Sequence, residues 1–226
     1  MKPAKAFTLI ELLIVVAIIA ILAAIAVPNF LEAQTRSKIS RAQADMRSQA
    51  TAIEAYRIDN NRYNPGYMTI RQGANVYAQT YFPTQPEDRL PYAWKYLTTP
   101  IAYMTSTLID PFTVGDYEFD RLSVKGSNGI EYWYDDYQQY GWAPAGQSGY
   151  VYSRFLRIVN RGYVWSISSG GPEKRTQQMW MALDGEDLAA ANGHIRFPYD
   201  PSNGTISEGF VARTSRGVYK EVHQTQ

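Results

Sequence analysis

The sequence predicts an α+β fold in which one long N-terminal helix packs on an antiparallel β-sheet domain. Residues 7–27 form an almost unbroken apolar run, and a helical apolar period continues beyond it to about residue 61. From Tyr63 onward the pattern changes to short segments separated by Gly, Pro and Asn, which is typical of strands joined by tight turns.

The apolar run is long enough to cross a bilayer as a helix, because about 20 apolar residues suffice. Lys2 and Lys5 precede it, so the N-terminus is expected to stay cytoplasmic and the remainder to be exported. Two other interpretations are an uncleaved anchor and a secretory signal peptide cut near Ala24-Ile-Ala26. The second is disfavoured because the helical pattern continues through that site.

Glu11 lies inside this run. A carboxylate in hydrocarbon costs about 2.5 kcal/mol or more on insertion scales, and a plain anchor gains nothing from one. We therefore expect the Glu11 carboxylate to pair with a positively charged group. The nearest candidate is a free α-amino group, created if the chain is cut between Ala6 and Phe7.

Residues 2–6 followed by 7–12, Phe-Thr-Leu-Ile-Glu-Leu, resemble the processing signal of type IV prepilins and type II secretion pseudopilins. The resemblance implies that a membrane prepilin peptidase removes the leader after Ala6 and methylates Phe7. It also implies that Glu11 docks against the N-terminal amine of a neighbouring subunit. Gly is usual where Ala6 stands, and the resemblance covers about the first quarter of the chain.

Beyond the run, the helix is expected to become amphipathic and to end near residues 59–61, which gives a length of about 80 Å. The apolar stripe consists of Ile39, Ala42, Met46, Ala50, Ile53 and Tyr56. Pro28 predicts a kink or local melting around residues 24–28, because proline removes a helical hydrogen bond. In the resembling family, a proline at this position marks the segment that loosens when the subunit enters the filament.

The domain is predicted to hold a short helical segment at residues 90–97 and several strands. The strand candidates are 130–134, 150–158, 162–168, 178–183, 197–200 and 205–211. Hairpins are expected at residues 160–162 and at Asn203-Gly204. Short stretches at 108–112, 165–172 and 199–209 resemble pseudopilin or pilin segments, and insertions are expected around 66–105 and 135–150.

The composition limits the classes of function. The 22 basic and 21 acidic residues balance, so a nucleic-acid-binding face is not expected, and the absence of cysteine excludes disulfides. The 18 tyrosines suit an exposed sheet surface or subunit contacts. Asp135 and Asp136, beside Tyr134 and Tyr137, are interpreted as an exposed Tyr-rich loop, with a carbohydrate-binding cluster as the alternative.

The sequence offers one candidate metal site. The resembling major pseudopilins hold calcium in a loop after a strand like that at 165–172, and calcium takes oxygen ligands. Here the loop offers Asp184, Glu186 and Asp187, with Glu173 where the family has Asp. The alternative is a solvated acidic turn in which Asp187 caps the helix that follows.

No catalytic motif is present. No serine lies in a nucleophile-elbow sequence that could form a catalytic triad with His194, so an enzyme is not expected. We expect the chain to divide into a leader (1–6), a transmembrane or spine helix (7–28), an amphipathic helix (29–62) and a β-rich globular domain (63–226). The expected function is a subunit of a type II secretion pseudopilus or type IV pilus-like filament. Its expected partners are copies of itself, the prepilin peptidase and the inner-membrane assembly platform. The alternatives are a membrane-anchored binding module or adhesin that does not polymerise, and a secreted enzyme.

Overall fold

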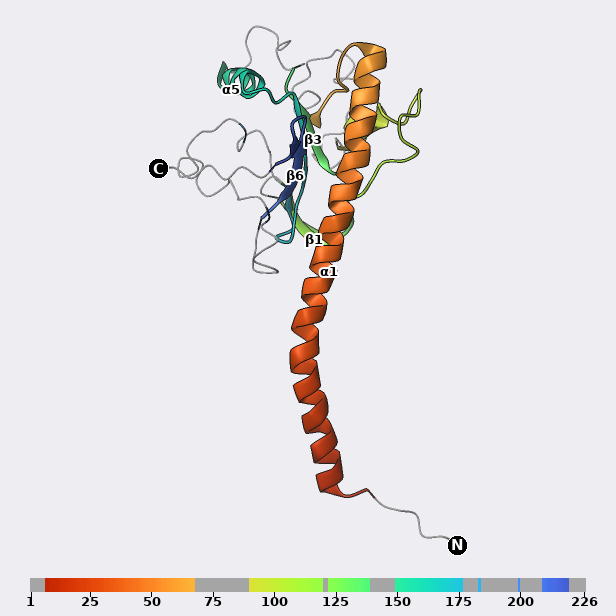
Figure 1. Cartoon of the computed structure of the whole chain (residues 1–226), viewed down its shortest axis with the longest axis vertical. Coiled ribbons are helices and arrows are strands. Elements are labelled where there is room, and N and C mark those ends of the chain that lie inside the picture. The colour runs from red at the N-terminus through yellow and green to blue at the C-terminus, as the bar shows by residue number, and fades with distance from the viewer. Residues whose placement is uncertain are drawn as a thin grey trace.

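The computed structural model describes residues 7–67, 90–119, 122–138, 149–176, 183, 199 and 209–219. Its longest element is helix α1, Leu9–Asn60, which extends far beyond the rest of the protein (Figure 1). Thr8 caps the helix from an extended backbone, and Asn61 ends it in the left-handed conformation with φ 51°. The predicted extent of the helix is confirmed.

The second half of α1 buries one face against the domain. Its buried apolar residues are Ile39, Ala42, Met46, Ala50, Ala52, Ile53 and Tyr56, a set that contains the whole predicted stripe. The buried positions recur at steps of three or four residues, which places them on one side of a helix. The amphipathic half of α1 is thereby confirmed.

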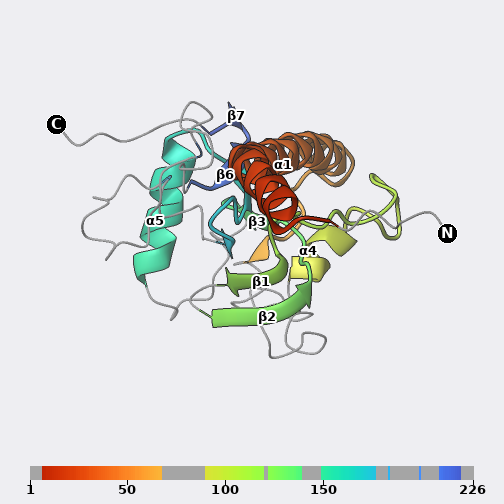
Figure 2. The same cartoon turned by 90° about the horizontal axis from the view of Figure 1, so that it is seen from below.

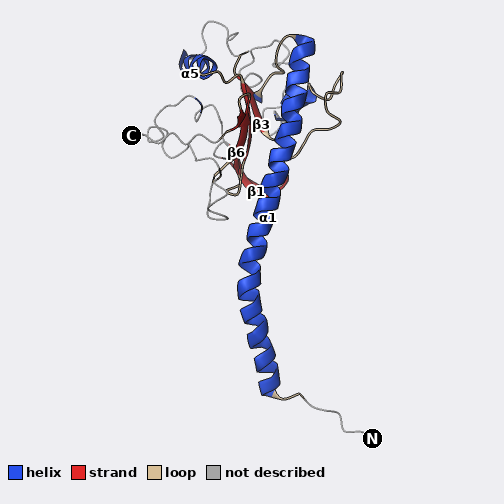
Figure 3. Cartoon of the chain, in the orientation of Figure 1, coloured by secondary structure: helices blue, strands red, loops and turns tan. Residues whose placement is uncertain are grey.

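A four-stranded antiparallel sheet lies against this face, beside the upper half of α1 (Figure 3). Its strands, in spatial order, are β3 (Trp133–Asp136), β4 (Trp165–Ser169), β6 (Val211–Thr214) and β7 (Gly217–Val218). Side chains alternate across the sheet, so Tyr134, Ile167 and Val211 join the core on the α1 side. Trp133 and Ala212 join a second core on the opposite side.

Helix α5, Gly149–Asn160, contributes to this second core through Phe155 and Ile158. The predicted strand at 150–158 is therefore wrong. The segment carries apolar residues at both the strand and the helix period, and the short run cannot separate them. Packing on the far face of the sheet stabilises the helical alternative.

The predicted hairpin at 160–162 is also wrong, because Gly162 ends α5. The Gly162 N–H donates to the Val159 carbonyl at 2.8 Å, and the Tyr163 N–H donates to the Ile158 carbonyl at 3.2 Å. Gly162 has φ 85°, which favours glycine. This double hydrogen bond is the Schellman ending of a helix, so an Asn-Arg-Gly sequence stops a helix here and does not join two strands.

A second sheet has the order β2-β1-β5. Strands β1 (Val114–Phe119) and β2 (Leu122–Asn128) form an antiparallel hairpin, and β5 (Arg175–Thr176) pairs with β1 in parallel. Seen from below, β1 and β2 lie side by side with β2 outermost (Figure 2). The short helix α4, Leu90–Lys95, confirms the predicted helical segment.

The other strand predictions are met in part. The segment 162–168 corresponds to β4, whereas 130–134 is displaced, because Ile130 bonds to Asp110 and Thr113 and the strand begins at Trp133. The segment 205–211 overlaps β6 at Val211, and residues 205–208 lie outside the described residues. Residues 178–182, the segment 197–200 apart from Tyr199, and the Asn203-Gly204 turn lie outside the described residues.

The tyrosines mainly build the core, and the expectation of an exposed tyrosine surface is wrong for the described side chains. Nine of them are buried, namely Tyr56, Tyr63, Tyr67, Tyr117, Tyr132, Tyr134, Tyr137, Tyr163 and Tyr219. Tyrosine hydroxyls also bind α1: the buried Tyr132 donates to Asp45 at 2.9 Å, and the half-buried Tyr103 donates to Asp59 at 3.0 Å. Trp165 likewise donates to Glu54 at 2.7 Å. These carboxylates hold the amphipathic half of α1 against the domain.

Candidate functional site

Glu11 forms a capping box with Thr8 at the start of α1. The Glu11 carboxylate accepts hydrogen bonds from the Thr8 N–H at 2.8 Å and the Thr8 hydroxyl at 2.7 Å, and the Glu11 N–H donates to Thr8 Oγ1 at 3.3 Å. Backbone donors that the helix leaves unpaired are satisfied in this way. A negative charge in the first turn is also favoured by the helix dipole.

The surface around Glu11 is apolar and makes no contribution to the buried core. Phe7, Leu9, Ile10, Leu12 and Leu13 are all exposed, each by more than half of its surface. The exposed apolar series continues along α1 as far as Leu31. Among the described residues, no basic side chain lies within ion-pair distance of Glu11. Within the described part of the subunit, the contacts of the Glu11 carboxylate are those with Thr8.

The predicted processing site lies just before the cap. Phe7 is exposed, and the helix begins two residues later. Ala6 lies outside the described residues, so cleavage between Ala6 and Phe7 stays a prediction. A new amine on Phe7 would be adjacent in sequence to Thr8, whose N–H already binds the Glu11 carboxylate.

Pro28 lies within α1, and the helix remains continuous through it. Local melting is therefore absent from this structure, and α1 curves gently along its length (Figure 1). The loosening of this segment on assembly stays a prediction.

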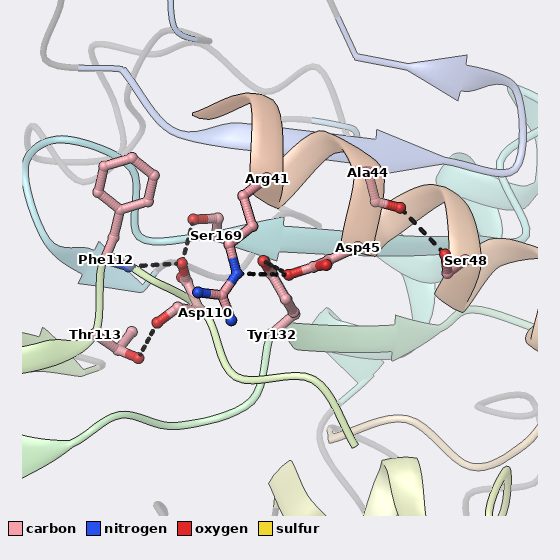
Figure 4. Close-up of polar contacts among 9 residues, drawn as sticks. All are labelled: Arg41, Ala44, Asp45, Ser48, Asp110, Phe112, Thr113, Tyr132 and Ser169. Carbon is pink, nitrogen blue, oxygen red and sulfur yellow. Dashed lines mark hydrogen bonds and ion pairs between the residues drawn. The ribbon is translucent and has the colours of Figure 1, made fainter. Parts of the chain in front are cut away.

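Two groups of polar contacts lie near one another where α1 meets the domain, one around the buried Asp110 and one around Asp45 of α1 (Figure 4). The Asp110 carboxylate accepts from the Ser169 hydroxyl at 2.8 Å, the Gly170 N–H at 2.8 Å and the Phe112 N–H at 3.0 Å. It thereby links the loop before β1 to the turn that follows β4. The sequence had marked the 108–112 stretch only by resemblance, because the donors lie about 60 residues away.

The surroundings of Asp110 disfavour the ionised form of its carboxyl group. Burial raises the pKa of Asp110 to about 6, and the nearby Asp45 carboxylate adds to the rise, while the three hydrogen bonds oppose it. The Arg41 side chain lies 3.7 Å from the Asp45 carboxylate, which also accepts a hydrogen bond from the Tyr132 hydroxyl. Burial, together with Asp110 and Asp45, raises the pKa of Tyr132. The contacts of Asp110 form a structural clamp between the loop before β1 and the end of β4, which we call the Asp110 clamp.

Both interpretations of Asp135 and Asp136 are wrong, because the two side chains are fully buried. Asp136 accepts from the Gly66 N–H at 2.8 Å, and Asp135 accepts from the Trp133 indole N–H at 2.8 Å. Their neighbours are buried as well, since the Tyr134 hydroxyl donates to the Asn64 carbonyl at 3.1 Å. Asp136 thus fastens the chain after α1 to β3, and both buried carboxylates are unavailable to a carbohydrate.

The calcium prediction falls on Asp184, Glu186 and Asp187, which lie outside the described residues. Glu173, in the described part, is half-buried in the turn after β4. Within the described ranges, no group of three His, Asp or Glu residues is placed to hold a metal ion. Calcium binding by the loop stays a prediction.

The described chain has one helix that is long and apolar enough to cross a membrane, and it is the N-terminal α1. Residues 1–27 match the family model described as the prokaryotic N-terminal methylation motif. The chain carries the N-terminal segment of the type IV pilin and pseudopilin family. The match includes the predicted cut, Phe7 and Glu11.

Similar proteins extend the match to about the first quarter of the chain. It is 52% identical over 63 residues to a type IV wide pilus major component of Thermus thermophilus, covering 28% of this chain and 48% of that protein. It is 52% identical over 60 residues to a type IV major pilin of Myxococcus xanthus, covering 26% and 27% of the two chains.

The chain is 36% identical over 59 residues to a type II secretion system core protein G of Pectobacterium carotovorum, covering 26% of this chain and 38% of that protein. The chain thus matches about a quarter to a half of the length of these relatives. No solved structure matches this chain.

Proposed function

We propose that the protein is a structural subunit of a pilus-like filament, either a type IV pilus or a type II secretion pseudopilus. The observation that carries the proposal is the contrast within α1. Its apolar half is exposed in the part of the subunit that the structure describes, and one charged residue, Glu11, interrupts the apolar run. An exposed surface of this kind needs a membrane before assembly and neighbouring helices after it.

In this proposal, prepilin peptidase cuts after Ala6 and methylates Phe7, and residues 7–28 become the filament spine. Residues 29–62 hold the globular domain of 63–226 outside the spine. Before assembly the N-terminus faces the cytoplasm, and the domain lies on the other side of the inner membrane, where an assembly platform extracts the subunit. The similarity to both pilins and a secretion protein supports the filament class and leaves the machine open.

Glu11 acts in the proposal as a register device. In the membrane, the Thr8 cap partly satisfies its carboxylate. In the drier spine, the amine of an adjacent Phe7 pairs with it, because opposite charges attract more strongly where water is excluded. A subunit out of register leaves a buried charge unpaired, which is strongly destabilising.

The charge can be tested separately from the cap. Glu11→Gln keeps an oxygen acceptor of similar size for Thr8 and removes the negative charge, whereas Thr8→Val removes the hydroxyl and keeps the charge. We expect Glu11→Gln to leave the subunit in the membrane and to abolish filaments, measured by shearing and electron microscopy. Normal filaments from Glu11→Gln would contradict the proposal.

Processing has its own readout. Intact-mass and N-terminal peptide mass spectrometry on protein from the native membrane should find a chain that begins at Phe7 and carries one extra methyl group. A chain beginning at Val27 would identify an ordinary secreted protein. A start at Met1 would identify an uncleaved anchor.

A further inference from the structure

A stretch of bare helix separates the apolar run from the domain. The run ends at Val27, whereas the first buried residue of α1 is Ile39. Lys38, one residue earlier, lies over the Phe112 ring at 5.8 Å from its centre. At 1.5 Å per residue, about 18 Å of helix lies between Val27 and Ile39. We call residues 28–37 the neck.

The neck is apolar at its lower end and charged above. Phe30 is 67% exposed and Leu31 is 51% exposed. One turn further on, the Arg36 guanidinium forms an ion pair with the Glu32 carboxylate. This ion pair directs the Arg36 side chain back toward the apolar run. On leaving a bilayer, a helix passes from hydrocarbon to the glycerol layer and then to the phosphates. Apolar side chains followed by a basic side chain match that order.

The dimensions agree with that order. The headgroup region adds about 5–7 Å to each side of a hydrocarbon core of about 30 Å. The run 7–27 matches the core, so the Cα atoms of Phe30 and Leu31 lie about 5–6 Å beyond it. Side chains on a helix tilt toward its N-terminus, so both point back to the hydrocarbon. Arg36 reaches back toward the level of Glu32, where lipid phosphates lie.

We infer that Phe30, Leu31 and Arg36 form a boundary anchor that binds the headgroup layer of the domain-side leaflet and sets the insertion depth of α1. The inference rests on the proposed membrane anchoring of the subunit. Phe30 and Leu31 bury apolar surface among the glycerol groups, and the Arg36 guanidinium binds phospholipid phosphates, for which its planar donor array is suited. The anchor holds the base of the domain clear of the membrane, with the upper part of the neck in water.

The absence of cysteine from the chain makes depth directly measurable. Leu22→Cys, Phe30→Cys and Ser48→Cys, each labelled with a nitroxide, would be reconstituted as full chains into phosphatidylcholine–phosphatidylglycerol vesicles. Accessibility to oxygen and to a water-soluble nickel chelate then reports depth. We expect the Leu22 label in hydrocarbon, the Ser48 label in water and the Phe30 label between them.

The three labels distinguish failure of the boundary anchor from failure of the membrane anchoring on which it rests. A Phe30 label as open to nickel as the Ser48 label, or as deep as the Leu22 label, would overturn the anchor alone. A Leu22 label open to nickel would overturn the membrane anchoring itself and the anchor with it.

A second experiment tests whether the anchor sets the depth. With the label at Ile25→Cys, the double change Phe30→Ser and Leu31→Ser should move the label outward, so that its nickel accessibility shifts toward that of the Ser48 label. Arg36→Gln should produce a smaller shift of the same sign. Ile58→Ser is the matched control, because Ile58 is 80% exposed on the same helix beyond the neck. An unchanged Ile25 label in the double variant, or an equal shift in Ile58→Ser, would contradict the inference.

Discussion

The two halves of α1 belong to one continuous helix and meet opposite surroundings. In the first half, Ile18 is 52% exposed and its apolar neighbours lie equally open, whereas in the second half Ile53 is fully buried. The second half is also held by hydrogen bonds from Tyr132, Trp165 and Tyr103 to its carboxylates. The difference teaches that one helix can stabilise a fold with one half and present the other half, complete, to different partners.

Matched substitutions in the two halves of α1 should give the largest difference in the free energy of unfolding. Ile53→Ala removes buried side-chain volume and should lower the free energy of unfolding by about 2–4 kcal/mol. Ile18→Ala makes the same chemical change in the exposed half and should alter it by less than about 0.5 kcal/mol. Denaturant unfolding of the full chain in detergent, followed by the fluorescence of the buried tryptophans, measures both. Equal losses would mean that the two halves are not distinct.

A pair of glycines tests how tightly the domain is packed where the Asp110 clamp meets it. Gly171 and Gly126 have similar positive φ angles of 60° and 63°. A Cβ at Gly171 would lie 2.3 Å from the Gly209 carbonyl oxygen, whereas at Gly126 it would meet nothing within 4 Å.

Both alanine variants should therefore bear the left-handed backbone cost of about 1–2 kcal/mol. Gly171→Ala should lose about 1–3 kcal/mol more through overpacking. The same unfolding experiment compares the two variants, and a Gly171→Ala variant as stable as Gly126→Ala would show that the turn is loosely packed.

The pH dependence of stability tests the clamp itself. The ordinary pKa of the carboxyl is 3.8, and in the folded domain the pKa of Asp110 rises to about 6. Between these values the folded state keeps a proton that the unfolded state has released. Stability from this group is thus present below pH 4 and is lost as the pH rises to 6, by up to about 1.4 kcal/mol per pH unit.

Comparison with variants isolates this contribution from other titrating groups. Asp110→Asn should flatten the slope between pH 4 and 6. Asp45→Asn should shift its midpoint to lower pH, because the Asp45 carboxylate raises the pKa of Asp110. A wild-type slope retained in Asp110→Asn would place the titration elsewhere.

The contrast within α1 was largely predictable from the sequence, whereas the domain was predictable only in outline. A stripe such as Ile39 to Tyr56 repeats over five helical turns, so its period is unambiguous. The segment 150–158 is too short for that, and the stop signal at Gly162 depends on whether a helix precedes it. The burial of Asp136 and Asp110 depends on donors at Gly66 and Gly170, which are distant in sequence.

The central claim is that the exposed half of α1 becomes a shared spine while the second half stays within its own subunit. Cysteine cross-linking in sheared filaments tests it most directly, since the chain has no native cysteine. Single cysteine substitutions at Leu13, Ile18 and Leu22, treated with a short bismaleimide, should give covalently linked dimers of subunits, because each chain then offers one thiol. Ile53→Cys should give monomers. Monomers from all three spine positions in intact filaments would contradict the account.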